Sequence, residues 1–263
     1  MNASFRLGIV GGAGWLGGAI AGAALSAGVV RAEDVALSFR SVKPDRFPGS
    51  FWTDDNQLLA DRSDIIMLSV RPQDWPSLKL DAKGKLVISV MAGIRIAKIG
   101  EKHCTRRVVR TLPNAAAEVA KSYTPWIASS DATEVDRIAV RAIFDACGVQ
   151  DEVGSERDID YLTGLTGSGP AFPAFLAEAM MRDAVAFGLS PEVARRAVNT
   201  VLTGTGRLLE INDASPADTV AAFLGYRGTT AAAIETMREA GFDEAVAKGL
   251  AAAFLKSIAM GKA

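Results

Sequence analysis

The sequence contains few of the residues that metal sites, disulfide frameworks and hydrolytic triads require. Among 263 residues there are one histidine and two cysteines. Cys104 and Cys147 are far apart and stand in no metal-ligand spacing, so we expect two free, buried thiols in a reducing compartment. No H-E-x-x-H, C-x-x-C or Ser-His-Asp arrangement occurs, and we therefore expect neither a metal ion nor a triad hydrolase.

Long apolar runs and blocks of like charge are also missing. No apolar stretch reaches the roughly 18 residues that a membrane-spanning helix needs, and the first residues lack the order of a secretion signal. The net charge is −1, and no basic cluster indicates nucleic acid or an anionic membrane as a partner. Hydrophobic residues make up 49% of the chain, enough for a sizeable core. We expect a soluble, cytoplasmic protein long enough for two domains.

Glycine is concentrated in one stretch near the N-terminus. An apolar run at residues 7–10 leads into Gly12, Gly14 and Gly17, a G-x-G-x-x-G pattern, and then into small and apolar residues at helical spacing. A strand, a tight turn and a helix in this order are typical of a dinucleotide-binding βαβ unit, and the alternative is a glycine-rich turn without a ligand. The expected roles are a turn at Gly12, close backbone approach to a pyrophosphate at Gly14, and helix–strand packing at Gly17.

The phosphates of such a cofactor would bind free N–H groups at the helix N-terminus. The loop residues expected to contact the cofactor are Gly12, Ala13, Gly14, Trp15, Leu16 and Gly17.

Arg40 and Ser41 directly follow the second predicted strand, residues 35–39. The end of this strand meets the adenosine ribose, where an acidic residue would accept hydrogen bonds from a free 2′-hydroxyl. A guanidinium and a hydroxyl stand there instead, and both suit a phosphate. This pair favours NADP(H) over NAD(H), with a solvated surface arginine as the alternative.

Strand-like runs that alternate with helical segments predict an α/β fold with a Rossmann-type, doubly wound sheet. The further runs are at residues 64–70, 86–90, 107–111, 125–129 and 149–153, with helices at 94–101 and 132–147. Because such sheets bind ligands beyond the C-terminal ends of their strands, the residues that follow the strands are candidate cofactor contacts. These are Ser69, Val70, Arg71, Pro72, Met91, Ala92, Gly93, Pro113 and Asn114.

From about residue 154 the pattern is helical throughout. We therefore expect a dinucleotide-binding domain at residues 1–154 and an all-helical domain at residues 155–263. Helix starts are indicated at residues 161, 170, 190–191, 215–216, 229–230 and 243. Small residues on these helices leave a broad apolar surface, which predicts a dimer.

The available side chains favour reduction of a C=N bond over oxidation of an alcohol. Alcohol oxidation needs a base such as histidine or lysine, but His103 lies at no motif spacing and no lysine occurs between Lys121 and Lys248. A protonated imine is already electrophilic and needs only orientation and a hydrogen bond. Glycine-marked breaks at 166–169 and 228–230 offer hydroxyl groups, although a helix kink and an N-cap are alternative explanations.

Taken together, these stretches resemble the pyrroline-5-carboxylate reductase family over nearly the whole chain. The markers are Gly12-Ala13-Gly14, Val70-Arg71-Pro72-Gln73, Leu112-Pro113-Asn114, Leu165-Thr166-Gly167-Ser168-Gly169-Pro170-Ala171-Phe172 and Arg227-Gly228-Thr229-Thr230. The resemblance implies NAD(P)H-dependent reduction of a cyclic imino acid to proline. It also implies a Rossmann domain followed by an all-helical dimerisation domain, with a larger ring of dimers as a further assembly.

The resemblance also implies roles for individual residues. Thr230 would hydrogen-bond the substrate nitrogen. Ser168, in the glycine-marked break at 166–169, is a second candidate catalytic hydroxyl on its residue type alone. Gly228 and Thr229 would hold the substrate carboxylate. Asn56 would contact the cofactor, and Pro113-Asn114 would lie at its nicotinamide end.

One departure from the family pattern concerns the expected carboxylate site. The family usually carries Ser-Pro-Gly before Gly-Thr-Thr, whereas this chain has Gly225-Tyr226-Arg227. Arg227 either binds the carboxylate through two nitrogens of its guanidinium group or changes the shape of the site so that it accepts another imine. The sequence therefore predicts reduction of 1-pyrroline-5-carboxylate, with a different cyclic or linear imine, or a non-catalytic NADP-binding regulatory protein, as alternatives.

Overall fold

The computed structural model describes residues 5–211 and 215–261. The chain forms two compact units, one that runs to Ser168 and includes the chain from Ala252 onward, and another at Gly169–Ala251. Within the described ranges, no helix is long and apolar enough to cross a membrane.

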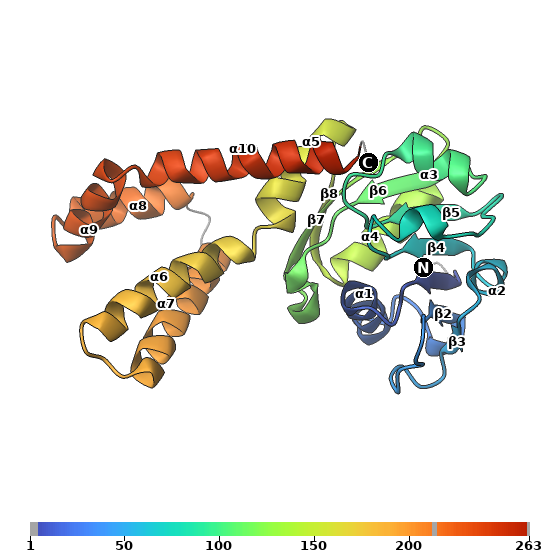
Figure 1. Ribbon diagram of the computed structural model, residues 1–263, viewed down its shortest axis with the longest axis horizontal. Coiled ribbons are helices and arrows are strands. Elements are labelled where there is room, and N and C mark those ends of the chain that lie inside the picture. Colours follow the sequence, from blue (N-terminus) through green and yellow to red (C-terminus); the bar gives the residue numbers. More distant parts are fainter. Residues whose placement is uncertain (1–4, 212–214, 262–263) are drawn as a thin grey trace. The chain divides into compact units, whose positions relative to one another are not determined.

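The first unit contains an eight-stranded sheet with the order β3-β2-β1-β4-β5-β6-β7-β8 (Figure 1). The strands are β1 Leu7–Val10, β2 Val35–Ser38, β3 Phe51–Thr53, β4 Ile65–Leu68, β5 Leu86–Ser89, β6 Val108–Thr111, β7 Ser122–Ala128 and β8 Gly148–Glu152. Neighbours from β3 to β6 are parallel, β7 is antiparallel to β6, and β8 is parallel to β7. The order grows outward from β1 in both directions, which confirms the doubly wound sheet.

Alternate residues of the central strands enter two separate cores. Ile9 and its partner Met67 on β4 pack on one face of the sheet, whereas Ile66 packs on the other. Helices α1 (Trp15–Ser26) and α4 (Glu134–Asp145) contribute to the first core, and α2 (Asn56–Asp61) and α3 (Ile96–Lys102) to the second. Because both faces are covered, every residue of β1, β2, β4, β5 and β6 is buried, as expected of a doubly wound sheet.

The edges of the sheet differ from the sequence-based expectation. The short strand β3 and helix α2 were not predicted, although Asp55 caps α2 by accepting hydrogen bonds from the backbone N–H groups of Gln57 and Leu58. The direction of β7 was also not predicted. Between β6 and β7 the chain forms only a 3₁₀ helix, Ala115–Val119. A parallel crossover needs a longer connection, so β7 turns back antiparallel.

Helix α5 (Glu156–Leu162) begins five residues before the start predicted at residue 161. Its N-cap is Ser155, whose hydroxyl accepts a hydrogen bond from the backbone N–H of Asp158 at 3.2 Å. A π-helical turn at Thr163–Gly167 follows. Residues 168–170 lie outside the helices, which confirms a break in this stretch. The end of α10 (Phe242–Met260) packs on these two segments in the same unit, where Gly164 meets Ala253.

The second unit consists of α6 (Ala171–Ala186), α7 (Pro191–Ile211), α8 (Pro216–Gly225), α9 (Thr229–Glu239) and the first part of α10. The starts of α7 and α8 are as predicted, and Ser215 forms a capping box with Asp218. Helix α9 begins at Thr229, as the sequence indicated, but its N-cap is Gly228 and not a threonine.

Large apolar side chains of this second unit are exposed. Within its described part, only Ala194, Val198 and Ala231 are buried. The exposed side chains include Phe172, Phe175, Phe187, Leu208, Ile211 and Phe223. An apolar surface of this kind is typical of a protein–protein interface.

Candidate functional site

The glycine-rich loop between β1 and α1 has the geometry of a dinucleotide loop. Gly11, with φ of 81°, adopts the left-handed conformation. Gly12, to which the sequence assigned the turn, follows it and donates its N–H to the carbonyl of Ile9 at 3.1 Å. At Gly12 a Cβ would lie 2.9 Å from Cβ of Leu37, and at Gly17 it would lie 2.7 Å from the carbonyl oxygen of Gly11. Only glycine therefore allows α1 and β2 to approach the loop this closely. Gly14 is the N-cap residue of α1, and no side chain caps this helix.

A cavity of about 830 Å³ is formed by residues at and beyond the C-terminal ends of β1, β2 and β4. It brings together eight residues that the sequence predicted: Ala13, Gly14, Arg40, Ser41, Asn56, Ser69, Val70 and Arg71. The strand order reverses at β1, and a cavity at this switch point is where doubly wound sheets bind their ligands. Further lining residues that the sequence did not indicate include Val42, Asp54, Asp74, Ser77, Leu78 and Lys79.

Two guanidinium groups at this cavity share one carboxylate. Arg40 Nη2 lies 2.9 Å and Arg71 Nε lies 3.0 Å from Oδ2 of Asp74. The hydrogen bond from Arg40, and then the one from Arg71, hold the pKa of Asp74 below its usual value. Lys79 also lines the cavity, so three cationic side chains face two carboxylates, those of Asp54 and Asp74. The excess positive charge suits a phosphate.

Asn56 provides an independent sign of a ligand at this cavity. Its Oδ1 is buried and has no hydrogen-bond partner in the described part of the chain. A buried acceptor without a donor costs free energy, which a ligand hydroxyl or amine would recover. With the glycine cradle and the cationic lining, these residues fit an adenine dinucleotide that carries an extra phosphate.

The residues after β5 and β6 do not line this cavity. Met91 is buried, and Gly93 has φ of 80° and lies close to Gly261. Asn114 uses both ends of its amide within the unit: Oδ1 accepts from the N–H of Ala116 at 2.9 Å, and Nδ2 donates to the carbonyl of Thr166 at 2.9 Å. The cofactor contacts expected of Met91, Ala92, Gly93, Pro113 and Asn114 remain predictions.

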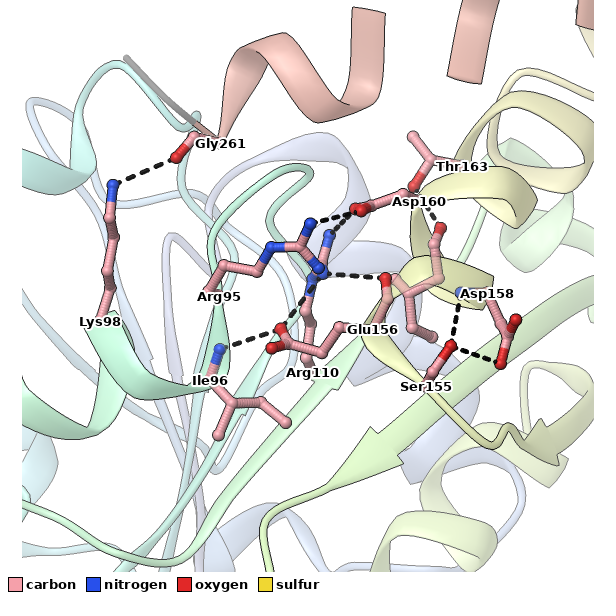
Figure 2. A network of polar contacts seen from close by, with 11 residues as sticks. Arg95, Ile96, Lys98, Arg110, Ser155, Glu156, Asp158, Asp160, Thr163 and Gly261 are labelled. Atoms are coloured by element: carbon pink, nitrogen blue, oxygen red, sulfur yellow. Dashed lines mark hydrogen bonds and ion pairs between the residues drawn. The ribbon is translucent and has the colours of Figure 1, made fainter. Parts of the chain in front are cut away.

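A buried ionic network joins these two loops to α5. Figure 2 shows Arg110 of β6 and Arg95, which follows the loop after β5, both directed at Asp160. Each arginine donates to Asp160 at 2.6 Å, and Arg110 is fully buried. Glu156 accepts hydrogen bonds from Arg110 at 3.2 Å and from the N–H of Ile96 at 3.1 Å. The network fixes α5 against the sheet.

The single histidine has a structural role. His103 is fully buried, and its Nε2 accepts a hydrogen bond from Trp75 Nε1 at 3.0 Å. Its Nδ1 lies 3.2 Å from the carbonyl oxygen of Leu80, which assigns the proton to Nδ1. Burial lowers the pKa of His103, so the ring is neutral. It supports the chain segment that contributes Ser77, Leu78 and Lys79 to the cavity.

The expected substrate residues of the second unit are exposed. Gly228 is the N-cap of α9, and the hydroxyls of Thr229 and Thr230 form no hydrogen bond within residues 5–211 and 215–261. Arg227 has φ of 50°, a backbone conformation that favours glycine. In the first unit, the Ser168 hydroxyl donates to the carbonyl of Thr163 at 3.3 Å. The roles of these residues remain predictions.

Comparison with known proteins identifies both parts of the chain. Residues 156–260 match a family model described as pyrroline-5-carboxylate reductase dimerisation. Residues 6–93, which include the glycine loop and β2, match a model described as NADP oxidoreductase, coenzyme F420-dependent. The two models therefore match different parts of the chain, one on each side of β6 to β8.

Relatives and solved structures extend the match over the full length. A pyrroline-5-carboxylate reductase of Synechocystis is 33% identical over 213 residues, 79% of each chain. The enzyme of that name from Methanosarcina acetivorans is 30% identical over 98% of both chains. The crystal structure of the Plasmodium falciparum pyrroline carboxylate reductase with NADP bound is 26% identical, with a TM-score of 0.85 over 99% of both chains. The chain belongs to the pyrroline-5-carboxylate reductase family.

Proposed function

We propose that this protein reduces 1-pyrroline-5-carboxylate to L-proline with NADPH. The observation that carries the proposal is the glycine loop that opens onto a cationic cavity at the switch point of the sheet, in a chain of this family. The substrate is proposed from the relatives, which are named pyrroline-5-carboxylate reductases. The cofactor class is proposed from the Plasmodium falciparum structure, which has NADP bound. When bound, NADPH provides the hydride that the C=N carbon receives.

For the cofactor, we assign the loop Gly12–Gly17 to the pyrophosphate and Arg40 with Ser41 to the 2′-phosphate. The cavity lining supports this assignment, since Arg71 and Lys79 add positive charge there. We assign Asn56 to a polar group of the adenosine half, because its buried Oδ1 lacks a donor. The remaining cofactor contacts are Trp15, Leu16, Ser69, Val70 and Pro72, with Met91, Ala92, Gly93, Pro113 and Asn114 toward the nicotinamide. The charge at Arg40 is the basis for the preference for NADPH over NADH.

For the substrate, we assign the start of α9. Backbone N–H groups at the first turn of a helix favour an anion, which suits a carboxylate at Gly228 and Thr229. The Thr230 hydroxyl, which has no partner within the described residues, would orient the imine nitrogen, with Ser168 as a second hydroxyl. The protein then has only to bind and orient an electrophile that is already activated.

We further propose that residues 1–154 act as the dinucleotide domain and residues 155–263 as the substrate and dimerisation domain. The exposed phenylalanine and leucine side chains of α6 and α7 support association through the helices. A homodimer is the basic assembly, and a larger ring of dimers is compatible with it.

The test is oxidation of reduced nicotinamide by purified protein with 1-pyrroline-5-carboxylate, followed by absorbance, with NADPH and NADH in parallel. In Arg40→Gln, a lost charge-assisted bond to the 2′-phosphate raises KM for NADPH by about tenfold or more and leaves KM for NADH unchanged. The control is Arg31→Gln, an exposed arginine paired with Glu33 and Asp34. Equal effects of Arg40→Gln on both cofactors would contradict the proposed preference.

A second candidate substrate is a different cyclic or linear imine. The observation that favours it is Arg227, whose exposed side chain and left-handed backbone stand where the family usually has glycine. A panel of imines in the same assay decides between the two. Turnover of another imine without turnover of 1-pyrroline-5-carboxylate would make Arg227 a determinant of specificity.

A further inference from the structure

Arg46 lies against the glycine loop, although it is far from the G-x-G-x-x-G pattern in sequence. Its Nη2 donates to the carbonyl oxygens of Gly12 at 2.7 Å and Gly14 at 3.2 Å. The guanidinium also lies 5.3 Å from the centre of the Phe47 ring, and this ring stacks on Trp52 with the two planes 4° apart. One side chain thus holds two carbonyl groups of the phosphate loop and is itself held by aromatic contacts.

Helix α1 has space for this side chain because of two glycines on one face. A Cβ on Gly18 would lie 2.7 Å from the Cζ of Arg46, so any larger residue there would displace the guanidinium. One helical turn further on, a Cβ on Gly22 would lie 3.5 Å from the Phe47 ring, an ordinary contact distance. Gly18 is therefore needed for the position of Arg46, whereas Gly22 tolerates a methyl group.

The position of Arg46 costs free energy through backbone strain and through polar and charged atoms that the described residues leave unpaired. Phe47 adopts φ of 56°, which is unfavourable for a residue with a Cβ. The Nε of Arg46 is buried and has no hydrogen-bond partner within the described residues. No carboxylate in the described ranges forms an ion pair with this guanidinium. Arg46 thus places beside the loop a positive charge that no carboxylate of residues 5–211 and 215–261 neutralises.

The two bonds fix the orientation of loop peptides. In a trans peptide the C=O and the next N–H point in opposite directions. The peptide after Gly12 is held at both ends, because Arg46 binds its oxygen and its Ala13 N–H donates to the carbonyl of Ser38 at 3.0 Å. In the peptide after Gly14, the oxygen accepts hydrogen bonds from Arg46 at 3.2 Å and from the N–H of Gly18 at 3.0 Å, so the N–H of Trp15 points away from the guanidinium. Trp15 is the first residue of α1, and N–H groups there have no acceptor within the helix.

We propose that Arg46 is a positioning residue of the dinucleotide site. It orients the N–H groups at the start of α1 toward the pyrophosphate and supplies a charge that compensates it. The inference rests on the proposed NADP(H) function but concerns a different part of the cofactor. Arg40 distinguishes a 2′-phosphate from a hydroxyl, whereas Arg46 acts on the pyrophosphate that NADPH and NADH share.

The test is binding of two nucleotide fragments by calorimetry. ADP-ribose contains the pyrophosphate without a 2′-phosphate, and adenosine 2′-monophosphate contains the 2′-phosphate without a pyrophosphate. In Arg46→Gln we expect Kd for ADP-ribose to rise about tenfold, the effect of one charge-assisted bond, while Kd for adenosine 2′-monophosphate stays within about twofold. Arg46→Lys keeps the positive charge but lacks the planar guanidinium with its several N–H donors, and it should restore part of the affinity for ADP-ribose.

Gly18→Ala separates positioning from folding stability. It should weaken the binding of ADP-ribose as Arg46→Gln does, although alanine stabilises a helix more than glycine does. Gly22→Ala is the matched control, and its affinity for ADP-ribose should be unchanged. Unchanged ADP-ribose affinity in Arg46→Gln, or equal weakening of both fragments, would overturn the inference. Failure of the proposed function is distinguishable: wild-type protein that binds neither fragment would refute the cofactor itself, and Arg40→Gln acts only on adenosine 2′-monophosphate.

Discussion

Asp160→Asn should destabilise the protein strongly, because it breaks the buried ionic network that joins α5 to the sheet. The carboxylate is 1% exposed and accepts hydrogen bonds of 2.6 Å from both Arg95 and Arg110 (Figure 2). The amide has a similar shape but no charge, and it leaves the fully buried Arg110 with Glu156 as its remaining carboxylate partner. Removing one partner of a buried ion pair costs about 3–5 kcal/mol. That cost is a large part of the roughly 5–15 kcal/mol that typically stabilise a domain.

The assay is equilibrium unfolding in urea, where the midpoint falls and the slope stays constant if the native state is otherwise intact. Asp158→Asn is the matched control, because Asp158 is an exposed carboxylate of the same helix. It should cost about 1 kcal/mol or less. An apolar replacement of the pair, Arg110→Met with Asp160→Leu, should recover much of the loss. A loss in Asp160→Asn no larger than that of Asp158→Asn would refute this reasoning.

Two further predictions concern the substrate hydroxyl and the buried histidine. Thr230→Val keeps the shape and removes the hydroxyl, so kcat should fall about a hundredfold with unchanged NADPH affinity, and unaltered turnover would contradict the assigned role. Because burial lowers the pKa of His103 below the ordinary value of 6.5, the unfolded chain takes up a proton before the native state does. The free energy of unfolding should therefore be constant above this pH and fall as the pH drops through it. Urea unfolding at a series of pH values checks this, and His103→Gln should lose this part of the pH dependence.

The central strands of the sheet could be predicted because each one is a short run of mostly apolar residues. All residues of Ile65–Leu68 and Leu86–Ser89 are buried, and all but Ser89 are apolar, as expected of strands covered on both faces. The edges gave weaker signals. Phe51–Thr53 is only three residues long and partly exposed, and the direction of β7 depends on the short connection before it. That connection was available in the sequence, since parallel neighbours need a longer crossover.

The candidate site could be predicted where it follows strand ends. Ser69 comes directly after β4, whereas Arg40 follows the end of β2 by two residues and Gly14 the end of β1 by four, and all three line the cavity. Asp74 and Arg46 do not follow the end of a strand in this way. Asp74 reaches the cavity because its loop folds back onto Arg40. Arg46 contacts the glycine loop, and the residue next to it, Phe47, has a left-handed backbone conformation. Both depend on tertiary contacts that no local pattern encodes.

The proposed reduction is tested most directly by following the hydride from NADPH into the product. Purified protein is supplied with 1-pyrroline-5-carboxylate and NADPH that carries deuterium at the transferable position of C4, and the product is analysed by mass spectrometry. We expect proline with a single deuterium, on the ring carbon that formed the C=N bond. Unlabelled substrate recovered intact, from protein that binds NADPH, would contradict it.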